Sequence, residues 1–204
     1  MTESSFEKIP PGFFKKWQEI ANLIANIMNV PAALIMKTED EFMEVFISSQ
    51  TKDNPYKVGD KEHWHGLYCE TVIKTQKKLL VPNALKDKNW DKNPDIKLGM
   101  IAYLGYPINF PDKKPFGTLC VLDKKERRFS AENEKLLLQF KKVIELDLAL
   151  IFTLELDKKF SHVDIIQKLS EKNEEYQAKN EELKQANEKL LKAKQKAEES
   201  EETY

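Results

Sequence analysis

The sequence predicts an α+β fold, in which terminal helices cover one face of an antiparallel sheet and a long helix of coiled-coil character follows. Two observations support this prediction. All 6 glycines and 9 prolines of the 204 residues lie at or before Gly117, so the later residues favour uninterrupted helix. Before Gly117, short apolar runs alternate with amphipathic segments. The chain therefore divides into an arm (1–12), a globular domain (13–155) and a coiled-coil helix (156–204).

The expected elements follow in order along the chain. An apolar face with steps of three and four predicts a first helix, which Pro31 should stop. It consists of Phe13, Trp17, Ile20, Ile24 and Ile27. Apolar runs bounded by turn residues predict strands at 32–37, 44–49 and 79–82, with a helix at 66–76 before the third.

The two clearest strands are 101–110 and 116–123, joined by a hairpin loop at 111–115. Residues 89–93 are expected to form a loop or a helical turn between the strands. Ser130 is the expected N-cap of the last helix, because its hydroxyl can accept a hydrogen bond from a free backbone N–H of the first turn.

The second half of that last helix has a heptad pattern. Leu or Tyr recurs at the d position and Asn at the a position, which favours a two-stranded pairing of moderate stability. The pattern comprises Ile166, Leu169, Asn173, Tyr176, Asn180, Leu183, Asn187, Leu190, Lys194 and Ala197. An isolated charged helix or a disordered tail is the alternative. Because so narrow an apolar seam is marginal for a single helix in water, we expect a homodimer.

Composition excludes several classes of function. With 33 basic and 34 acidic residues the net charge is -1, which argues against a general nucleic-acid binder. The sequence has no apolar run long enough to span a membrane and no secretory signal at its start. Two cysteines in a chain of this length favour a reduced, cytoplasmic protein over a disulfide scaffold.

Four stretches of the globular part resemble the GAF domain, a small-molecule-binding module of bacterial signalling proteins. They are LYCETVI (67–73), LLVPNALKDKNWDKNP (79–94), YLGYPI (103–108) and FGTLCVLD (116–123). With the flanking helices the resemblance covers roughly residues 13–154. The segment 185–200 is similar to the coiled coil that precedes the phosphoacceptor helices of histidine kinases. The resemblance thus implies the sensory part of a longer kinase, without catalytic activity of its own.

Several chemical roles are weighed against this implication. His162 departs from the phosphoacceptor box, since Val163 follows it and no proline lies downstream. Cys69 and Cys120 raise the possibility of redox sensing, or of a thiol enzyme similar to the family's free methionine sulfoxide reductases. Those enzymes have cysteines in the loop before the late strands, and residues 87–100 have none here.

Cofactor binding has little support in the motifs. Three residues, His63, His65 and Cys69, are candidates for a metal or haem site. His65 and Cys69 would share one helix face if the helix begins near His65, but a zinc site needs three or four ligands. Bilin-binding relatives place a His after the attachment Cys, whereas Glu70 follows Cys69. The signature of cyclic-nucleotide-binding relatives is absent. The cofactor or ligand is therefore left unidentified.

Strand parity predicts which side chains face a ligand cavity. The even positions of 102–110, with Leu119 and Val121, form apolar sets that should pack on the terminal helices. Tyr103, Thr118 and Cys120 would then face the cavity of the GAF family. Segments that usually roof that cavity add further candidates, which are Trp64, Cys69 and Trp90. Ordinary core and lid residues are the alternative reading of all six.

Together these patterns predict a sensory module that responds to a small molecule or to redox state. It would transmit its signal through a dimeric coiled coil to a histidine kinase. The alternatives are a dimerisation module with a vestigial pocket and the thiol enzyme.

Overall fold

The computed structural model describes the backbone of residues 9–201, and their side chains except those of 158–161, 164, 186, 187 and 190–201. Residues 1–8 of the predicted arm lie outside this range. So do the side chains of four heptad positions, namely Asn187, Leu190, Lys194 and Ala197. The chain divides into two units, Met1–Phe152 and Thr153–Tyr204.

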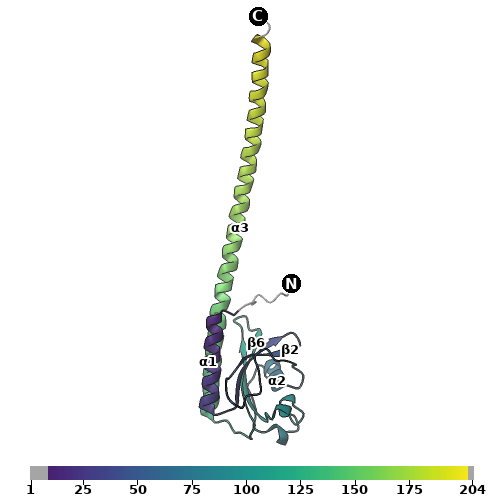
Figure 1. Ribbon diagram of the computed structural model, residues 1–204, viewed down its shortest axis with the longest axis vertical. Helices are drawn as coiled ribbons and strands as arrows, with labels where there is room; N and C mark the ends of the chain where they lie inside the picture. The colour runs from purple at the N-terminus through teal and green to yellow at the C-terminus, as the bar shows by residue number, and fades with distance from the viewer. Residues whose placement is uncertain (1–8, 202–204) are drawn as a thin grey trace. The chain divides into compact units, whose positions relative to one another are not determined.

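The first unit is built on a six-stranded antiparallel sheet, as predicted (Figure 1). The strand order is β3-β2-β1-β6-β5-β4. The strands are β1 (Ala32–Glu39), β2 (Phe42–Ser48), β3 (Lys61–His63), β4 (Leu79–Val81), β5 (Ala102–Asn109) and β6 (Pro115–Asp123). The three-residue edge strand β3 was not expected from the sequence, because KEH has neither apolar alternation nor β-branched residues.

The helices begin and end near the predicted positions. Helix α1 (Pro11–Met28) has Pro11 in its first turn and ends because Asn29 adopts a left-handed conformation, φ 47°, before Pro31 is reached. Helix α2 spans Tyr68–Thr75. Helix α3 spans Ala131–Glu201, and Ser130 Oγ accepts a hydrogen bond from the backbone N–H of Asn133 at 3.2 Å, as an N-cap should. Two short 3₁₀ helices, η1 (Ala84–Lys86) and η2 (Pro94–Leu98), flank the segment predicted as irregular.

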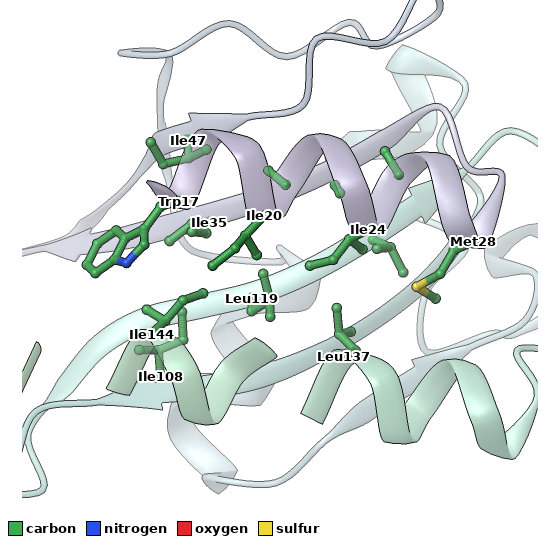
Figure 2. Packing of buried hydrophobic residues seen from close by; sticks show 14 of the residues in the cluster. Trp17, Ile20, Ile24, Met28, Ile35, Ile47, Ile108, Leu119, Leu137 and Ile144 are labelled. Atoms are coloured by element: carbon green, nitrogen blue, oxygen red, sulfur yellow. The ribbon is translucent and has the colours of Figure 1, made fainter. Parts of the chain in front are cut away.

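One face of the sheet packs on α1 and on the first turns of α3. Figure 2 shows Trp17, Ile20 and Ile24 of α1 directed toward the strands, with Leu137 and Ile144 of α3 in the same cluster. The predicted parity of β5 and β6 is confirmed. The strand residues on this face include Leu104, Ile108, Leu119 and Val121.

A buried polar contact fixes α1 against α3 within this core. Trp17 Nε1 donates to Asp147 Oδ2 at 2.8 Å, and Lys16 Nζ donates to Asp147 Oδ1 at 2.7 Å. The indole N–H needs an acceptor once it is buried, and the carboxylate supplies one.

The opposite face packs on α2 and on the loops. Its buried residues form a second cluster that contains Leu34, Met43, Tyr68, Cys69, Tyr103 and Cys120. The pairing of β1 with β2 shifts by one residue after Ile35, so that Phe46 is extra. Because of this shift, Met43 and Val45 lie in the second cluster while Ile47 lies in the first.

In the second unit, the described part of α3 exposes the predicted heptad seam. The relative exposure of Ile166, Leu169, Tyr176 and Leu183 is 60% or more in the single chain. Pairing of this seam in a coiled coil stays a prediction. Within residues 9–201, no helix has a stretch long and apolar enough to cross a bilayer.

Candidate functional site

A cleft of about 390 Å³ opens on the face of the sheet that contacts α2. Met36, Met43 and Val45 of β1 and β2 form its apolar floor, and Leu67 closes one side. The polar rim comes from the loop before β3, from β3 and from η2. This combination of an apolar floor with few polar groups is typical of small-molecule sites, and the volume lies within their usual range.

A second, inner cavity of about 20 Å³ continues from this cleft. Four residues line both spaces and so form a neck between them, namely Met36, Tyr56, Leu67 and Asp95. The inner cavity is lined further in by Cys69, Tyr103 and Cys120. It is large enough for about one water molecule or a small head group.

Asp95 is positioned by the start of η2. Asn93, which is buried, accepts a hydrogen bond from the Asp95 backbone N–H at 2.9 Å and donates through Nδ2 to the Gly66 carbonyl at 2.8 Å. The η2 segment is thereby tied to the residue that precedes α2 by two positions. Gly99, at φ 81°, then ends η2 in a left-handed conformation that favours glycine.

Tyr56 reaches the same neck from the loop before β3. Its hydroxyl donates to Asp95 Oδ1 at 2.7 Å. The loop is held in place by Asn54, whose Nδ2 donates to the Ser49 carbonyl at 2.7 Å and whose Oδ1 accepts from the Tyr56 backbone N–H at 3.0 Å. The neck is therefore built from two segments that are anchored independently.

The Asp95 carboxyl is poorly solvated. Burial raises its pKa to about 6, the Tyr56 hydroxyl opposes this rise, and the negative charge of Glu62 adds to it. No salt bridge to Asp95 occurs among the described residues. The Tyr68 hydroxyl nearby is buried without a hydrogen-bond partner, and both burial and the charge of Asp95 raise the pKa of Tyr68.

The rim of the cleft has more free negative than free positive charge. Lys61 lines the cleft, but its ammonium group is paired with Glu39 at 2.5 Å and with Glu44 at 3.6 Å. The remaining charged lining residues are Asp60, Glu62, Asp95 and Lys97. Three carboxylates thus face one ammonium group around the opening.

A cluster of thiols and hydroxyls lies at the inner end. Thr118 Oγ1 donates to Cys69 Sγ at 3.2 Å, and Tyr103 Oη lies 3.5 Å from the same sulfur. A hydrogen bond from the Cys120 thiol, helped by Thr118, lowers the pKa of Cys69 despite its burial. The pKa of Cys120 is raised by the same interaction and by burial. Both cysteines are free thiols.

Aromatic rings form the wall behind this cluster. Tyr68 stacks on Tyr103 with ring centroids 4.7 Å apart, and Trp90 lies against Tyr68 at 5.1 Å. Gly105 leaves room for Tyr103, because a Cβ at Gly105 would lie 2.5 Å from Tyr103 Cζ. A larger residue at this position is incompatible with the observed ring position.

A second cleft of about 390 Å³, at the C-terminal end of α1, has a structural explanation. Arg127 donates there to the carbonyls of Met28 at 2.6 Å and Asn29 at 2.9 Å, and it pairs with Asp123. These bonds satisfy carbonyl groups that the end of the helix leaves free. The guanidinium group of Arg127 and the carbonyls at this end of α1 are therefore already paired.

The structure brings together part of the predicted ligand set. Cys69, Tyr103 and Cys120 line the inner cavity, and Thr118 contacts Cys69 from behind. Trp64 and Trp90 are half-buried members of the second cluster and line neither space. A ligand-binding role for these six residues stays a prediction.

Sequence analysis missed the neck and the cleft. Tyr56 lies in a loop and Asp95 in the short helix η2, neither of them marked by a periodic pattern, and Met36 and Met43 are unremarkable strand residues. The only available signal was the parity of Met36, which places it on the same face as Leu34.

The histidines near α2 do not gather around Cys69. Helix α2 begins at Tyr68, so the condition under which His65 and Cys69 would share a helix face is not met. His65 Nδ1 instead lies 3.2 Å from Glu70 Oε1, and His63 packs on the Phe42 ring. Within the described residues, no three His, Cys, Asp or Glu side chains are grouped closely enough to hold a metal ion.

These features define a class of protein: an antiparallel sheet with two helices on one face and a cleft on the other. The GAF domain family model matches residues 16–148, and the chain belongs to this family. No curated protein matches the chain.

Solved structures share the fold at low sequence identity. The blue-light absorbing form of the PixJ GAF domain from Thermosynechococcus elongatus is 14% identical, with a TM-score of 0.61 over 76% of this chain and 98% of that one. The GAF domain of an Acinetobacter phosphoenolpyruvate-protein phosphotransferase is 19% identical, with a TM-score of 0.56 over 69% and 84%. Free methionine-R-sulfoxide reductase from Neisseria meningitidis, in complex with its substrate, is 9% identical, with a TM-score of 0.55 over 71% and 81%. The fold thus occurs in a light-absorbing domain, in a phosphotransferase and in a reductase, so it does not define function by itself.

Proposed function

We propose that the first unit is a sensor that binds a small organic molecule in the cleft and the inner cavity. The observation that supports this function is the neck, where Tyr56 and Asp95 lie between an open space of about 390 Å³ and a buried one. A half-buried, hydrogen-bonded carboxyl at the junction of two spaces is suited to orienting a ligand. Membership of a family of sensory modules supports the same function.

The test is to purify the chain under native conditions, denature it and identify any released compound by mass spectrometry. An absorbance spectrum recorded beforehand would reveal a haem or bilin. A stoichiometric compound that protects Cys69 from alkylation in the native protein supports the proposal. A protein that releases nothing and whose thermal midpoint no compound raises in a broad metabolite screen would refute it.

We further propose that the signal travels along α3 to a histidine kinase through a parallel dimeric coiled coil. The first turns of α3 pack on the sheet through Leu137 and Ile144, and no Gly or Pro follows in the sequence. The ligand must bind two states of this helix with different affinity for a signal to result. Replacing Asn173, Asn180 and Asn187 by Ile should strengthen the a positions and lock the output of a full-length kinase. Unchanged signalling in that variant would contradict the idea.

Redox sensing at Cys69 is a second candidate, because hydrogen bonds lower the pKa of this thiol, which lines the inner cavity. Thiolates react with peroxides and alkylating agents faster than thiols do. A Cys120→Ala variant lacks the largest stabilising interaction of the Cys69 thiolate, so Cys69 should be alkylated more slowly at pH 7.5. An unchanged alkylation rate would remove this candidate.

Two alternatives are separated by the same preparations. Turnover of free methionine sulfoxide that is lost in Cys69→Ser would indicate a thiol enzyme, whereas we expect no turnover. A chain that dimerises in sedimentation velocity but binds nothing would be a dimerisation module with a vestigial pocket.

A further inference from the structure

We propose that the ligand of this cleft is a protonated primary or secondary amine with an apolar body, whose ammonium group binds Asp95. This inference rests on the proposed sensory function and names the chemical class of the ligand. It follows from the arrangement of charge, free hydrogen-bond capacity and apolar surface around the neck.

The Asp95 carboxylate has free hydrogen-bond capacity. A carboxylate has about four acceptor sites, and the Tyr56 hydroxyl uses one of them on Oδ1. None of the described salt bridges involves Asp95. Asp95 is also the least exposed of the carboxylates that line the cleft, since Asp60 and Glu62 are exposed. A carboxylate removed from water needs a cation or several N–H donors. An ammonium group supplies both.

The charge around Asp95 in the cleft lining is mainly negative. Lys61 also lines the cleft, but its charge is paired with Glu39 and Glu44, which leaves Lys97 against Asp60, Glu62 and Asp95 in the lining. An anionic head group at the neck would meet this excess of carboxylates, whereas a cation is attracted into it. The charge therefore selects against carboxylate and phosphate ligands.

The third step concerns the aromatic and sulfur-containing surroundings of the carboxyl. Tyr56 lies at the neck, and Tyr68 and Tyr103 lie stacked behind it with the unpaired Tyr68 hydroxyl. Aromatic faces attract ammonium groups that have lost part of their hydration. The floor formed by Met36 and Met43 is polarizable and adapts to an aryl or alkyl body.

The experiment uses two triplets of compounds that share a carbon skeleton and differ in head-group charge. They are 2-phenylethylamine, 2-phenylethanol and phenylacetate, and hexylamine, hexanol and hexanoate. Binding to the full chain is measured by calorimetry and thermal shift at pH 7.5. We expect the amine to bind at least about tenfold more tightly than its alcohol and acid. In Asp95→Asn, the affinity for the amine should fall roughly 10- to 100-fold, as for loss of a charged hydrogen bond, while that for the alcohol changes less than about threefold.

Two variants serve as controls. Asp112 lies in the hairpin between β5 and β6, where it pairs with Lys114, and it does not line the cleft. Asp112→Asn should therefore leave amine affinity unchanged. Glu62→Gln removes a rim charge and should weaken the amine only about threefold, because exposed charges act weakly through water. An equal effect of Glu62→Gln and Asp95→Asn would overturn the assignment of the ammonium group to Asp95.

A pH series on the unmodified chain is independent of any variant. Amine affinity should fall as the pH decreases from 7 to 5, because Asp95 becomes protonated, while the affinity for the alcohol should not change. The other charged and titratable groups that line the two cavities are Tyr56, Asp60, Lys61, Glu62, Cys69, Lys97, Tyr103 and Cys120. Glu62→Gln and Cys69→Ser variants that retain the pH dependence would assign it to Asp95.

The outcomes separate this inference from the proposed function. If an alcohol or acid binds as tightly as its amine, or the natively purified chain releases an uncharged or anionic compound, the amine proposal fails and the sensory function stands. If no triplet member binds, the chain releases no compound and no compound of the metabolite screen raises its thermal midpoint, both fail. An amine that binds in preference and requires Asp95, or a released organic cation, supports the inference.

Discussion

The fit between Gly105 and Tyr103 allows a quantitative test of the wall behind the inner cavity. In Gly105→Ala, the new Cβ would lie 2.5 Å from Cζ and 2.8 Å from Cε1 of Tyr103. The ring cannot move freely, because Tyr103 is fully buried and stacked on Tyr68. Overpacking of this kind costs about 1–3 kcal/mol, and loss of the aromatic pair would add about 0.5–1.5 kcal/mol.

An opposing effect reduces this sum. Alanine restricts the unfolded chain more than glycine does, which stabilises the folded strand by about 0.5–1 kcal/mol. We therefore expect Gly105→Ala to lower the free energy of unfolding by about 1–3 kcal/mol. Urea denaturation followed by fluorescence would measure it, and Cys69 should become more accessible to alkylation because Tyr103 moves from its sulfur.

The double variant decides whether the clash is the cause. In a Tyr103→Leu background the ring is absent, so Gly105→Ala should be neutral or stabilising by about 0.5–1 kcal/mol. The interaction energy between the two substitutions should then be at least about 1.5 kcal/mol. An equal loss of stability in both backgrounds would show that the strand needs glycine for another reason and would refute the packing argument.

Three further predictions concern buried polar groups. Asp147→Ala removes the acceptor of the Trp17 indole N–H and should lower the free energy of unfolding by about 1–3 kcal/mol, whereas Asp147→Asn should cost less; thermal denaturation of both variants checks this. Arg127→Gln leaves the Met28 carbonyl without its donor and should cost about 1–2 kcal/mol, measured by urea denaturation; an unchanged midpoint would contradict the proposed capping. The pKa of Asp95 is raised from 3.8 to about 6. Without ligand, the free energy of unfolding should therefore decrease by up to about 3 kcal/mol as the pH increases from about 4 to 6, and it should stay lower above pH 6. Asp95→Asn should therefore be more stable than the parent at pH 7.5 and similar to it at pH 4; a variant that is less stable at pH 7.5 would contradict this.

Much of the fold could be predicted from the sequence because its signals are periodic. The apolar face of Trp17, Ile20 and Ile24 repeats at the helical period, and Leu119 and Val121 alternate at the strand period. Both patterns report burial on one side of an element, which the chain must satisfy locally. The same parity placed Tyr103 and Cys120 on the face opposite the terminal helices, where the structure has them.

The site could be predicted only in part, because its neck depends on loop geometry. The hydrogen bond between Tyr56 and Asp95 joins residues 39 positions apart, and bonds of Asn54 and Asn93 hold the two segments in place. No local periodicity encodes such a meeting. The extra residue in β2 is similarly hidden, since simple alternation would place Ile47 on the face of Met43 and the structure places it on the other.

The roof segments were predicted by family resemblance, and the contact of their side chains with a ligand stays a prediction. Large aromatic side chains were expected to face the cavity. Trp90 instead buries its ring against Tyr68 and supports the wall from behind. A tryptophan has enough apolar surface to stabilise a lid by packing alone, so its presence in a lid segment does not distinguish support from contact with a ligand.

The two faces of the sheet thus serve different physical purposes. The face toward α1 and α3 is largely apolar, and the buried carboxylate of Asp147 there is paired with Lys16 and Trp17. On the other face, Asp95 is desolvated with a tyrosine hydroxyl as its hydrogen-bonding partner. An asparagine could keep that hydrogen bond and the backbone of η2 without the charge, and it would fold more favourably at neutral pH. An aspartate at this position is therefore explained better by a state in which a cation offsets its desolvation than by the stability of the domain alone.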